Sequence, residues 1–223
     1  MKKFVVLFIV AVCAVGIQAA NIPLVNGGFE EPWADYWYTA VEAGVGIEVV
    51  PGWTVSQGIA YGGVTYADYA TEGYQTFWIQ TNNGIHDMPY DLGNTQQAVR
   101  QITGSSAVEG KEYTLNFDYT GAYGWANLKE LSARILIDGV AVSSIEAYDI
   151  PAGVGWFNYS TSYLATAADA GKTLGVEFYF DNLNNPAWHS QNIIDNVQLT
   201  EVPEPATLVI LSIGGIALFR KRK

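Results

Sequence analysis

The chain has 223 residues, and its acidic side chains outnumber the basic ones, with 22 Asp and Glu against 11 Lys and Arg. The imbalance is larger between residues 21 and 200, where five basic residues face twenty acidic ones. Such a segment repels phosphate, which excludes nucleic acid and anionic lipid as partners and leaves divalent cations and neutral sugars. Cys13 is the only cysteine, so an exported domain after it depends on its core, on a metal, or on both.

The first twenty residues have the pattern of a secretory signal. Met1 to Lys3 is a charged start, residues 4–17 are apolar, and residues 18–20 (Gln-Ala-Ala) offer small side chains for cleavage. This order is typical of a Sec signal peptide, an apolar helix that is removed during export. We therefore expect residues 1–20 to be lost and the segment that follows to lie outside the cytoplasm.

The last twenty-two residues, 202–223, contain a second targeting pattern. Proline lacks an N–H group and fixes φ, so Pro203, Glu204 and Pro205 end the preceding strand. The next residues, 206–219, carry no charge and are fewer than the ~20 that span a bilayer comfortably. The chain ends in four basic residues: Arg220, Lys221, Arg222 and Lys223. Because basic residues stay on the cytoplasmic side, the sequence predicts a short C-terminal transmembrane helix with this end inside.

This order of Pro-Glu-Pro, short apolar run and basic terminus closely resembles the PEP-CTERM sorting signal of bacterial surface proteins. The resemblance implies recognition by an exosortase, a membrane peptidase, near residues 203–205, with loss of the tail much as a GPI signal is removed. It also implies a host that makes extracellular polysaccharide, transient anchoring in the inner membrane, and a final location at the cell surface or beyond it. The same tail class occurs on unrelated domains, one of them described for ice binding, so it indicates an address and not an activity.

The domain between the two signals, residues 21–201, has the pattern of β-strands. Aromatic and β-branched residues alternate with polar ones at a period of two, and Gly and Asn separate the runs. Asp138-Gly139 between two apolar runs is a strong signal for a two-residue hairpin turn. The expected strands lie at residues 74–80, 97–103, 113–119, 132–142 (a hairpin), 156–164, 174–180 and 193–199. The pattern favours an all-β fold, one antiparallel β-sandwich of the jelly-roll kind.

Short segments at both ends of this domain resemble a known family. The domain opens with residues 24–30 (Leu-Val-Asn-Gly-Gly-Phe-Glu), followed by Gly52-Trp53, and closes with residues 194–199 (Ile-Asp-Asn-Val-Gln-Leu). Between them lie Gly73, Gln97 and residues 110–115 (Gly-Lys-Glu-Tyr-Thr-Leu). The succession resembles galactose-binding-like jelly rolls, notably carbohydrate-binding modules of the family 4/9/22 kind, over nearly the whole domain.

In that family the opening Glu and the Asp of the last strand hold a structural Ca²⁺. The resemblance carries these roles to Glu30 and Asp195, and Glu72 is a third expected ligand. Calcium accepts six to eight oxygens, a mixture of carboxylates and backbone carbonyls. The alternative is that residues 26–28 form only a turn and that Asp195 is an exposed strand residue. Asp195 shares its expected face with Ile193, Val197 and Leu199, where an unpaired carboxylate is costly.

Aromatic residues are the candidates for sugar contact, and the chain has seven Trp and fourteen Tyr. Flat rings pack on sugar rings, while amides and carboxylates bind the hydroxyl groups. Trp53 and Trp156 fall where the family keeps core residues. Four others lie in loop-like surroundings and are the expected ligand contacts: Trp37, Tyr123, Trp125 and Trp188. The alternative for each of them is packing beneath a long loop.

An enzyme has little support in the sequence. Gly-x-Ser-x-Gly, His-Glu-x-x-His and phosphate-binding loops do not occur. The two histidines, His86 and His189, are far apart, and no spacing singles out a pair of carboxylates. We therefore expect a non-catalytic surface or matrix protein with a carbohydrate-binding-like sandwich. A structural surface protein without a specific sugar is the alternative, and a glycan-acting enzyme is the least favoured hypothesis.

Overall fold

The computed structural model describes residues 19–33, 41–66, 70–82, 96–121, 131–147, 155–180 and 189–202. These residues form strands and one 3₁₀ turn, η1 (Ala167–Asp169), which confirms the predicted all-β class. The strands are β1 (Ala20–Ile22), β2 (Val41–Gly44), β3 (Glu48–Val50), β4 (Trp53–Gln57), β5 (Ile59–Tyr66), β6 (Gln75–Asn82), β7 (Gln97–Ser106), β8 (Glu112–Gly121), β9 (Leu131–Ile137), β10 (Val140–Ala147), β11 (Phe157–Leu164), β12 (Thr173–Phe180) and β13 (His189–Val202).

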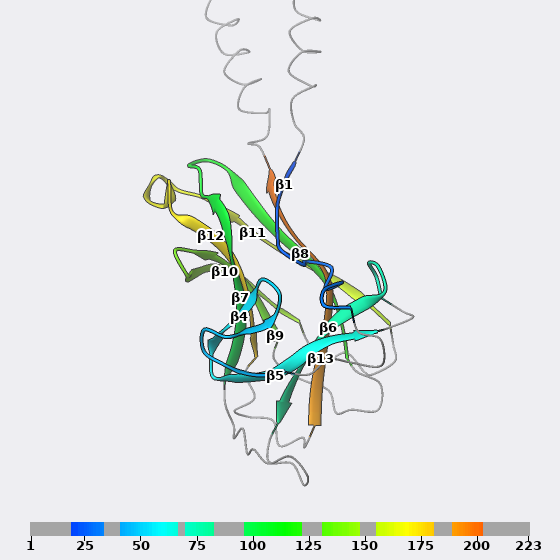
Figure 1. The fold of residues 1–223 in the computed structure, drawn as a ribbon. Helices are drawn as coiled ribbons and strands as arrows, with labels where there is room; N and C mark the ends of the chain where they lie inside the picture. Colours follow the sequence, from blue (N-terminus) through cyan, green and yellow to red (C-terminus); the bar gives the residue numbers. More distant parts are fainter. Residues whose placement is uncertain are drawn as a thin grey trace, which may run out of the picture.

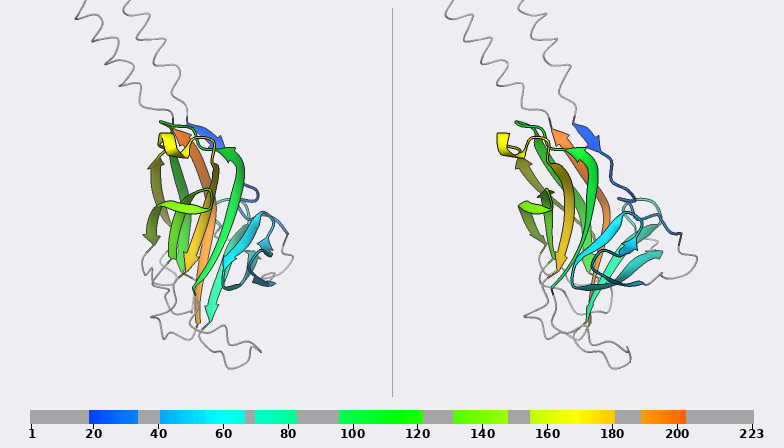
Figure 2. Two further views of the ribbon diagram at one scale, coloured as in Figure 1. Left: turned by 90° about the vertical axis from the view of Figure 1, so that its left-hand side faces the viewer. Right: turned by 60° about the vertical axis from the view of Figure 1, so that its left-hand side comes forward.

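Two antiparallel sheets pack face to face as a sandwich (Figure 1, Figure 2). The first sheet has the order β11-β8-β13-β6-β5-β2, with β1 added beside β13. The second sheet has the order β10-β9-β12-β7-β4-β3. The predicted signal helix and C-terminal helix lie outside the described residues. Within those residues, no helix has the length and apolar character needed to cross a membrane.

Alternation along the strands builds the core between the two sheets. β8, β12 and β6 each place every second side chain inward, where apolar burial stabilises the fold. Four rings from distant segments meet at its centre. Trp53 packs on Phe29 and Phe178 with ring centroids 5.5 and 5.6 Å apart, and Phe117 meets Phe178 edge-on at 5.2 Å. Trp53 is therefore the core residue that the sequence predicted.

The predicted hairpin turn is confirmed. Asp138 and Gly139 both have positive φ, 51° and 76°, as the tight turn between β9 and β10 requires. Val140 pairs with Ile137 directly after it.

A β-bulge in β13 changes which side chains share a face. The register against β8 shifts between Asp195 and Gln198, and Asn196 has a positive φ of 50°. The expectation that Asp195 shares a face with Val197 and Leu199 is therefore wrong. Val197 and Leu199 enter the core, whereas Asp195 lies on the outer face of the first sheet with Ile193.

The two ends of the domain lie side by side. β1 pairs antiparallel with the end of β13, with Ala20 opposite Glu201 and Ile22 opposite Leu199 (Figure 1). The first and last strands are thus neighbours.

We predict that Phe178→Ala lowers the free energy of unfolding by about 3–5 kcal/mol, because it leaves a cavity among Trp53 and Phe117 that the strands cannot close. Chemical denaturation monitored by tryptophan fluorescence measures this loss. Val140→Ala, at an exposed position of the hairpin, is the control and should change stability by less than about 0.5 kcal/mol. Equal losses in both variants would contradict this description of the core.

Candidate functional site

The three predicted metal ligands converge on one segment, residues 71–75, which leads into β6. Asp195 comes to it from β13 and Glu30 from the opening turn, and Glu72 lies within it. The sequence therefore identified residues that the fold brings together, although they stand far apart along the chain.

Asp195 is a fully buried carboxylate that accepts four hydrogen bonds. Its Oδ2 accepts from the Thr71 N–H at 2.7 Å, the Thr71 hydroxyl at 2.9 Å and the Glu72 N–H at 3.0 Å. Its Oδ1 accepts from the Asn196 N–H at 2.7 Å. Burial raises the pKa of Asp195 to about 6, and the four donors act in the opposite direction by stabilising the charge. Alternation along β13 turns this carboxylate outward, two residues after Ile193, and the bulge that follows returns Val197 and Leu199 to the core.

Glu30 holds the other half of the same segment. Its Oε1 accepts from the Tyr74 N–H at 2.7 Å and the Gln75 N–H at 2.9 Å. Gly73 lies between the two sets of bonds with a φ of +64°, and a Cβ there would collide with the Glu30 carboxylate. Only glycine adopts this positive φ without strain and also leaves room for the carboxylate. Two carboxylates from opposite ends of the domain therefore fix residues 71–75 through four backbone N–H groups, two on either side of Gly73.

The oxygen atoms of this cluster fit calcium only in part. Asp195 Oδ2 is occupied by three donors, but Glu30 Oε2 and the exposed Glu72 carboxylate make no hydrogen bond to the described residues. Within the described ranges, no group of three or more His, Cys, Asp and Glu side chains is spaced to hold a metal ion. The cluster thus has the charge and ligand type that calcium prefers but not a closed cage, and the calcium site stays a prediction.

The outer face of the first sheet carries a row of amide and carboxylate side chains above this cluster. Asp118 is its centre: Oδ1 accepts from Asn158 Nδ2 at 2.9 Å and Oδ2 from Asn196 Nδ2 at 3.0 Å. We call Asn116, Asp118, Asn158, Asn196 and Gln198 the amide row. Alternation along β8 already placed Asn116 and Asp118 on a polar face, but no local pattern indicates that β11 and β13 add amides beside them.

An apolar cluster adjoins the amide row on the same face. Trp78 is 2% exposed and packs with Ile193, and Trp156 packs against both. Phe77 and Ile79 face the core instead, so Trp78 belongs to the outer side. The expectation that Trp156 is a core residue is wrong, because it lies half-buried in this outer cluster instead of between the sheets.

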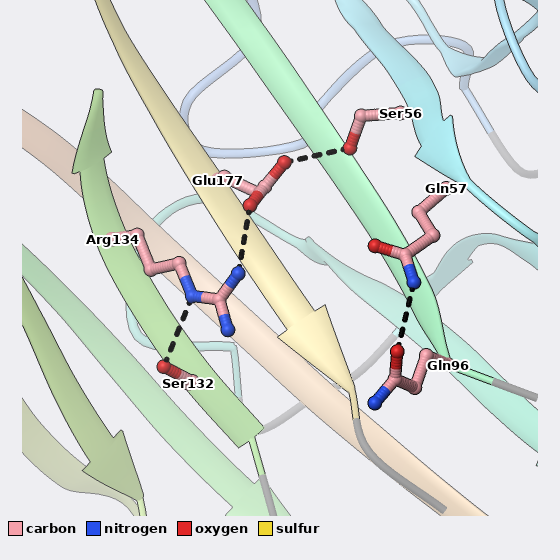
Figure 3. Close-up of polar contacts among 6 residues, drawn as sticks. All are labelled: Ser56, Gln57, Gln96, Ser132, Arg134 and Glu177. Atoms are coloured by element: carbon pink, nitrogen blue, oxygen red, sulfur yellow. Dashed lines mark hydrogen bonds and ion pairs between the residues drawn. The ribbon is translucent and has the colours of Figure 1, made fainter. Parts of the chain in front are cut away.

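Polar residues on the outer face of the second sheet form a different cluster (Figure 3). Glu177 accepts from Arg134 Nη1 at 3.2 Å and from the Ser56 hydroxyl at 2.7 Å, which ties together β9, β12 and β4. The Arg134 guanidinium also lies over the Tyr179 ring, 3.8 Å from its centroid. These groups satisfy one another, and their role is to fix the strands.

The interior contains a few polar side chains near one end of the sandwich. Gln97 is 1% exposed, and neither its Oε1 nor its Nε2 has a hydrogen-bond partner among the described residues. From the facing sheet, the Tyr119 hydroxyl donates to Asn192 Oδ1 at 2.7 Å. An unsatisfied buried amide is costly and calls for an explanation.

The remaining predicted site residues lie outside the described residues, so their roles stay predictions. They are the sugar contacts Trp37, Tyr123, Trp125 and Trp188, the sorting residues 203–205 and the basic residues 220–223.

We predict that Asp195→Ala lowers the free energy of unfolding by about 3 kcal/mol, since it leaves buried N–H donors without an acceptor. Asp195→Asn should also destabilise, because its amide places an N–H group against other donors. Thermal unfolding checks both variants. The control is Glu109→Gln, which removes a charge at an exposed position and should leave the melting temperature unchanged. An Asp195→Ala variant as stable as the wild type would contradict the role assigned to Asp195.

Two family models match different parts of the chain. A family model described as HpiC1 cyclase matches residues 20–200. The PEP-CTERM protein-sorting motif matches residues 201–223, which confirms the predicted signal and implies export and sorting to the cell surface. No curated protein matches the chain.

Solved structures with the same fold include cyclases. The Stig cyclase Fisc from Fischerella sp. TAU, in complex with (3Z)-3-(1-methyl-2-pyrrolidinylidene)-3H-indole, is 17% identical with a TM-score of 0.66, over 84% of this chain and 100% of that chain. A cyclase from the same organism, in complex with 4-(1H-indol-3-yl)butan-2-one, is 19% identical with a TM-score of 0.65, over 83% and 99%. The carbohydrate-binding module CBM4 is 17% identical with a TM-score of 0.47, over 80% and 99%. Because the family model covers most of the sequence, the chain belongs to the HpiC1-like cyclase family, and it carries a PEP-CTERM sorting motif at its end.

Proposed function

We propose that this exported protein is a non-catalytic glycan-binding protein of the cell surface or extracellular matrix, and that it binds through the outer face of the first sheet. The observation that carries the proposal is the amide row. Asp118 aligns the side chains of Asn158 and Asn196 by accepting one hydrogen bond from each. Aligned amides and carboxylates present donors and acceptors at fixed spacing, as neighbouring hydroxyl groups of a sugar require.

The charge of the domain narrows the class of glycan. Acidic residues dominate residues 21–200, so an anionic polysaccharide is repelled over the whole surface. A neutral polysaccharide has no such penalty. Extracellular polysaccharide is therefore the partner that fits both the acidic surface and the exported location.

The state of the carboxylates supports binding without catalysis. Asp195 has a raised pKa, as a general acid needs, but it is buried under residues 71–72 and hydrogen-bonded at both oxygens. Asp118 lies within the amide row, but each of its two oxygens accepts an amide hydrogen. A catalytic carboxyl group has to exchange a proton with the substrate, whereas both oxygens of Asp118 and of Asp195 are already engaged by hydrogen-bond donors.

We predict that Asn158→Ala and Asp118→Asn each weaken binding of a neutral oligosaccharide about tenfold, which corresponds to ~1.4 kcal/mol. Asn158→Ala removes a donor, and Asp118→Asn turns one of the two acceptor oxygens into a donor, so that only one of the two amides is still held in place. A glycan array of neutral plant and bacterial oligosaccharides finds the ligand, and calorimetry measures its affinity. Gln57→Ala, which removes an exposed amide of the second sheet bonded to Gln96, is the control and should bind as the wild type does. A protein that binds no glycan would leave the structural surface role as the better description.

A second candidate function is cyclisation of a small aromatic molecule, which membership of the HpiC1-like family favours. The polar residues of the interior, Gln97 with Tyr119 and Asn192, are where a small buried substrate could find hydrogen bonds. The ligand of one similar cyclase, 4-(1H-indol-3-yl)butan-2-one, distinguishes the candidates. If this compound binds to the wild type and to Asn158→Ala but not to Gln97→Ala, the result would favour the cyclase and contradict the glycan proposal.

Structural calcium is part of the proposal. Three groups of this cluster still have oxygen lone pairs to offer a cation: Glu30 Oε2, the Glu72 carboxylate and Asp195 Oδ1, which accepts only one hydrogen bond. They lie where the opening turn and the last strand meet. No basic residue occurs in residues 19–33 or 70–82 to balance their charge. A calcium ion held there would join these segments and neutralise the carboxylates.

We predict that calcium at a hundredfold excess over its Kd stabilises the fold by about 2.7 kcal/mol and that EDTA reverses this effect. Glu72→Gln separates the effect of calcium from that of the hydrogen bonds, because the Glu72 side chain makes no hydrogen bond to the described residues. This variant should unfold like the wild type in EDTA but should not respond to calcium, whereas Glu109→Gln should respond fully. Differential scanning calorimetry with and without calcium makes the comparison. An unchanged wild-type melting curve after calcium addition would show that the backbone N–H groups alone satisfy these carboxylates.

A further inference from the structure

Two exposed aromatic rings stand beside the segment that Asp195 and Glu30 hold. The Trp33 side chain is 54% exposed and the Tyr74 side chain is 62% exposed. Their ring centroids are 6.3 Å apart with an interplanar angle of 72°. Two large rings that are each more than half exposed at adjacent positions indicate a contact surface, because burying them on a ligand gains free energy. We call Trp33 and Tyr74 the aromatic platform.

The backbone beneath the platform is fixed before any ligand binds. Glu30 accepts from the Tyr74 N–H, and the fully buried Gln75 donates from Nε2 to the Pro32 carbonyl at 3.2 Å. On the other side, Asn26 and Glu31 exchange two hydrogen bonds: Asn26 Nδ2 donates to the Glu31 carbonyl at 2.6 Å, and the Glu31 N–H donates to Asn26 Oδ1 at 3.0 Å. Binding therefore orders little more than the two rings themselves, which preserves affinity.

The charges around the platform favour a neutral ligand over an anionic one. Residues 19–33 and 70–82 contain three acidic residues, Glu30, Glu31 and Glu72, and no basic residue. Carboxylates repel anions but accept hydrogen bonds from hydroxyl groups. Rings flanked by carboxylates match a sugar, which has apolar C–H groups on its faces and hydroxyls at its edge.

The platform is connected to the amide row by hydrogen-bonded residues. The Glu72 N–H, two residues before Tyr74, donates to Asp195, and Asp195 accepts from the Asn196 N–H. The Asn196 side chain in turn donates to Asp118. The two surfaces are therefore joined by hydrogen bonds, with the row on β11, β8 and β13 and the platform beside the segment that leads into β6.

We propose that the aromatic platform is an outlying subsite for an extended neutral polysaccharide, whose other sugar units lie along the amide row. This inference rests on the proposed glycan binding. A long chain contacts both surfaces at once, so the platform adds affinity only for oligosaccharides long enough to reach it. The ligand class is thus a linear neutral glycan rather than a single sugar or a chain end.

The test compares neutral β-1,4-linked hexasaccharides of glucose, xylose and mannose with the matching trisaccharides and with the cationic β-1,4-linked hexasaccharide of glucosamine. Calorimetry on the full-length chain, in a detergent without a sugar headgroup, measures each affinity. Trp33→Ala and Tyr74→Ala should each weaken the preferred hexasaccharide about tenfold and leave the trisaccharide unchanged. Tyr74→Phe keeps the ring and should bind within about twofold of the wild type. Asn158→Ala should weaken both lengths.

The outcomes separate this inference from the function on which it rests. Wild-type binding of hexasaccharides that is unaffected in Trp33→Ala and Tyr74→Ala would overturn the subsite and leave the amide row as the binding surface. If the wild type binds none of the sugars, both the subsite and the proposed glycan binding are overturned. Stronger, Trp33-dependent binding of the glucosamine hexasaccharide would overturn the neutral class, since it would show that the platform selects a cation. Val140→Ala, which shortens an exposed side chain on β10, is the matched control and should not change any affinity.

Discussion

The buried carboxylate of Asp195 is the interaction on which the functional face depends. It costs free energy to bury a charge, and four hydrogen bonds offset that cost. Three of those bonds come from residues 71–72, so the last strand fixes a segment more than a hundred residues earlier in the chain. Glu30, in the opening turn, holds the next part of this segment by accepting hydrogen bonds from the Tyr74 and Gln75 N–H groups. The outer face, the platform and the proposed calcium ligands are all arranged around this junction.

The outer faces of the two sheets differ in how their polar side chains are satisfied. Ring contacts among Trp53, Phe117 and Phe178 hold the sheets together, and the Arg134–Glu177 pair keeps the outer face of the second sheet closed by internal bonds. The first sheet differs, because its outer face leaves amides aligned but exposed. A sandwich can vary this one face without disturbing the packing between its sheets.

Much of the fold could be predicted from the alternation of apolar residues, since the period of two directly reports which face of a strand is buried. The Asp138-Gly139 turn was equally predictable because both positions require positive φ. The bulge at Asn196 was not, and one extra residue there reversed the expected faces of Val197 and Leu199. Glu30 and Asp195 were singled out as metal ligands by a family resemblance. The contact between Trp33 and Tyr74 joins distant segments, and no local pattern encodes it.

The place of β13 in the first sheet has a mechanical consequence. β13 lies between β8 and β6 and also pairs with β1, and it runs to Val202, where the sorting motif follows. Tension applied through the chain beyond Val202 therefore pulls a central strand along its own axis. Many ladder hydrogen bonds on both sides carry that load together and must break in shear, instead of opening one after another as at a sheet edge. The domain is thus built to stay folded under force applied from the end at which it is sorted.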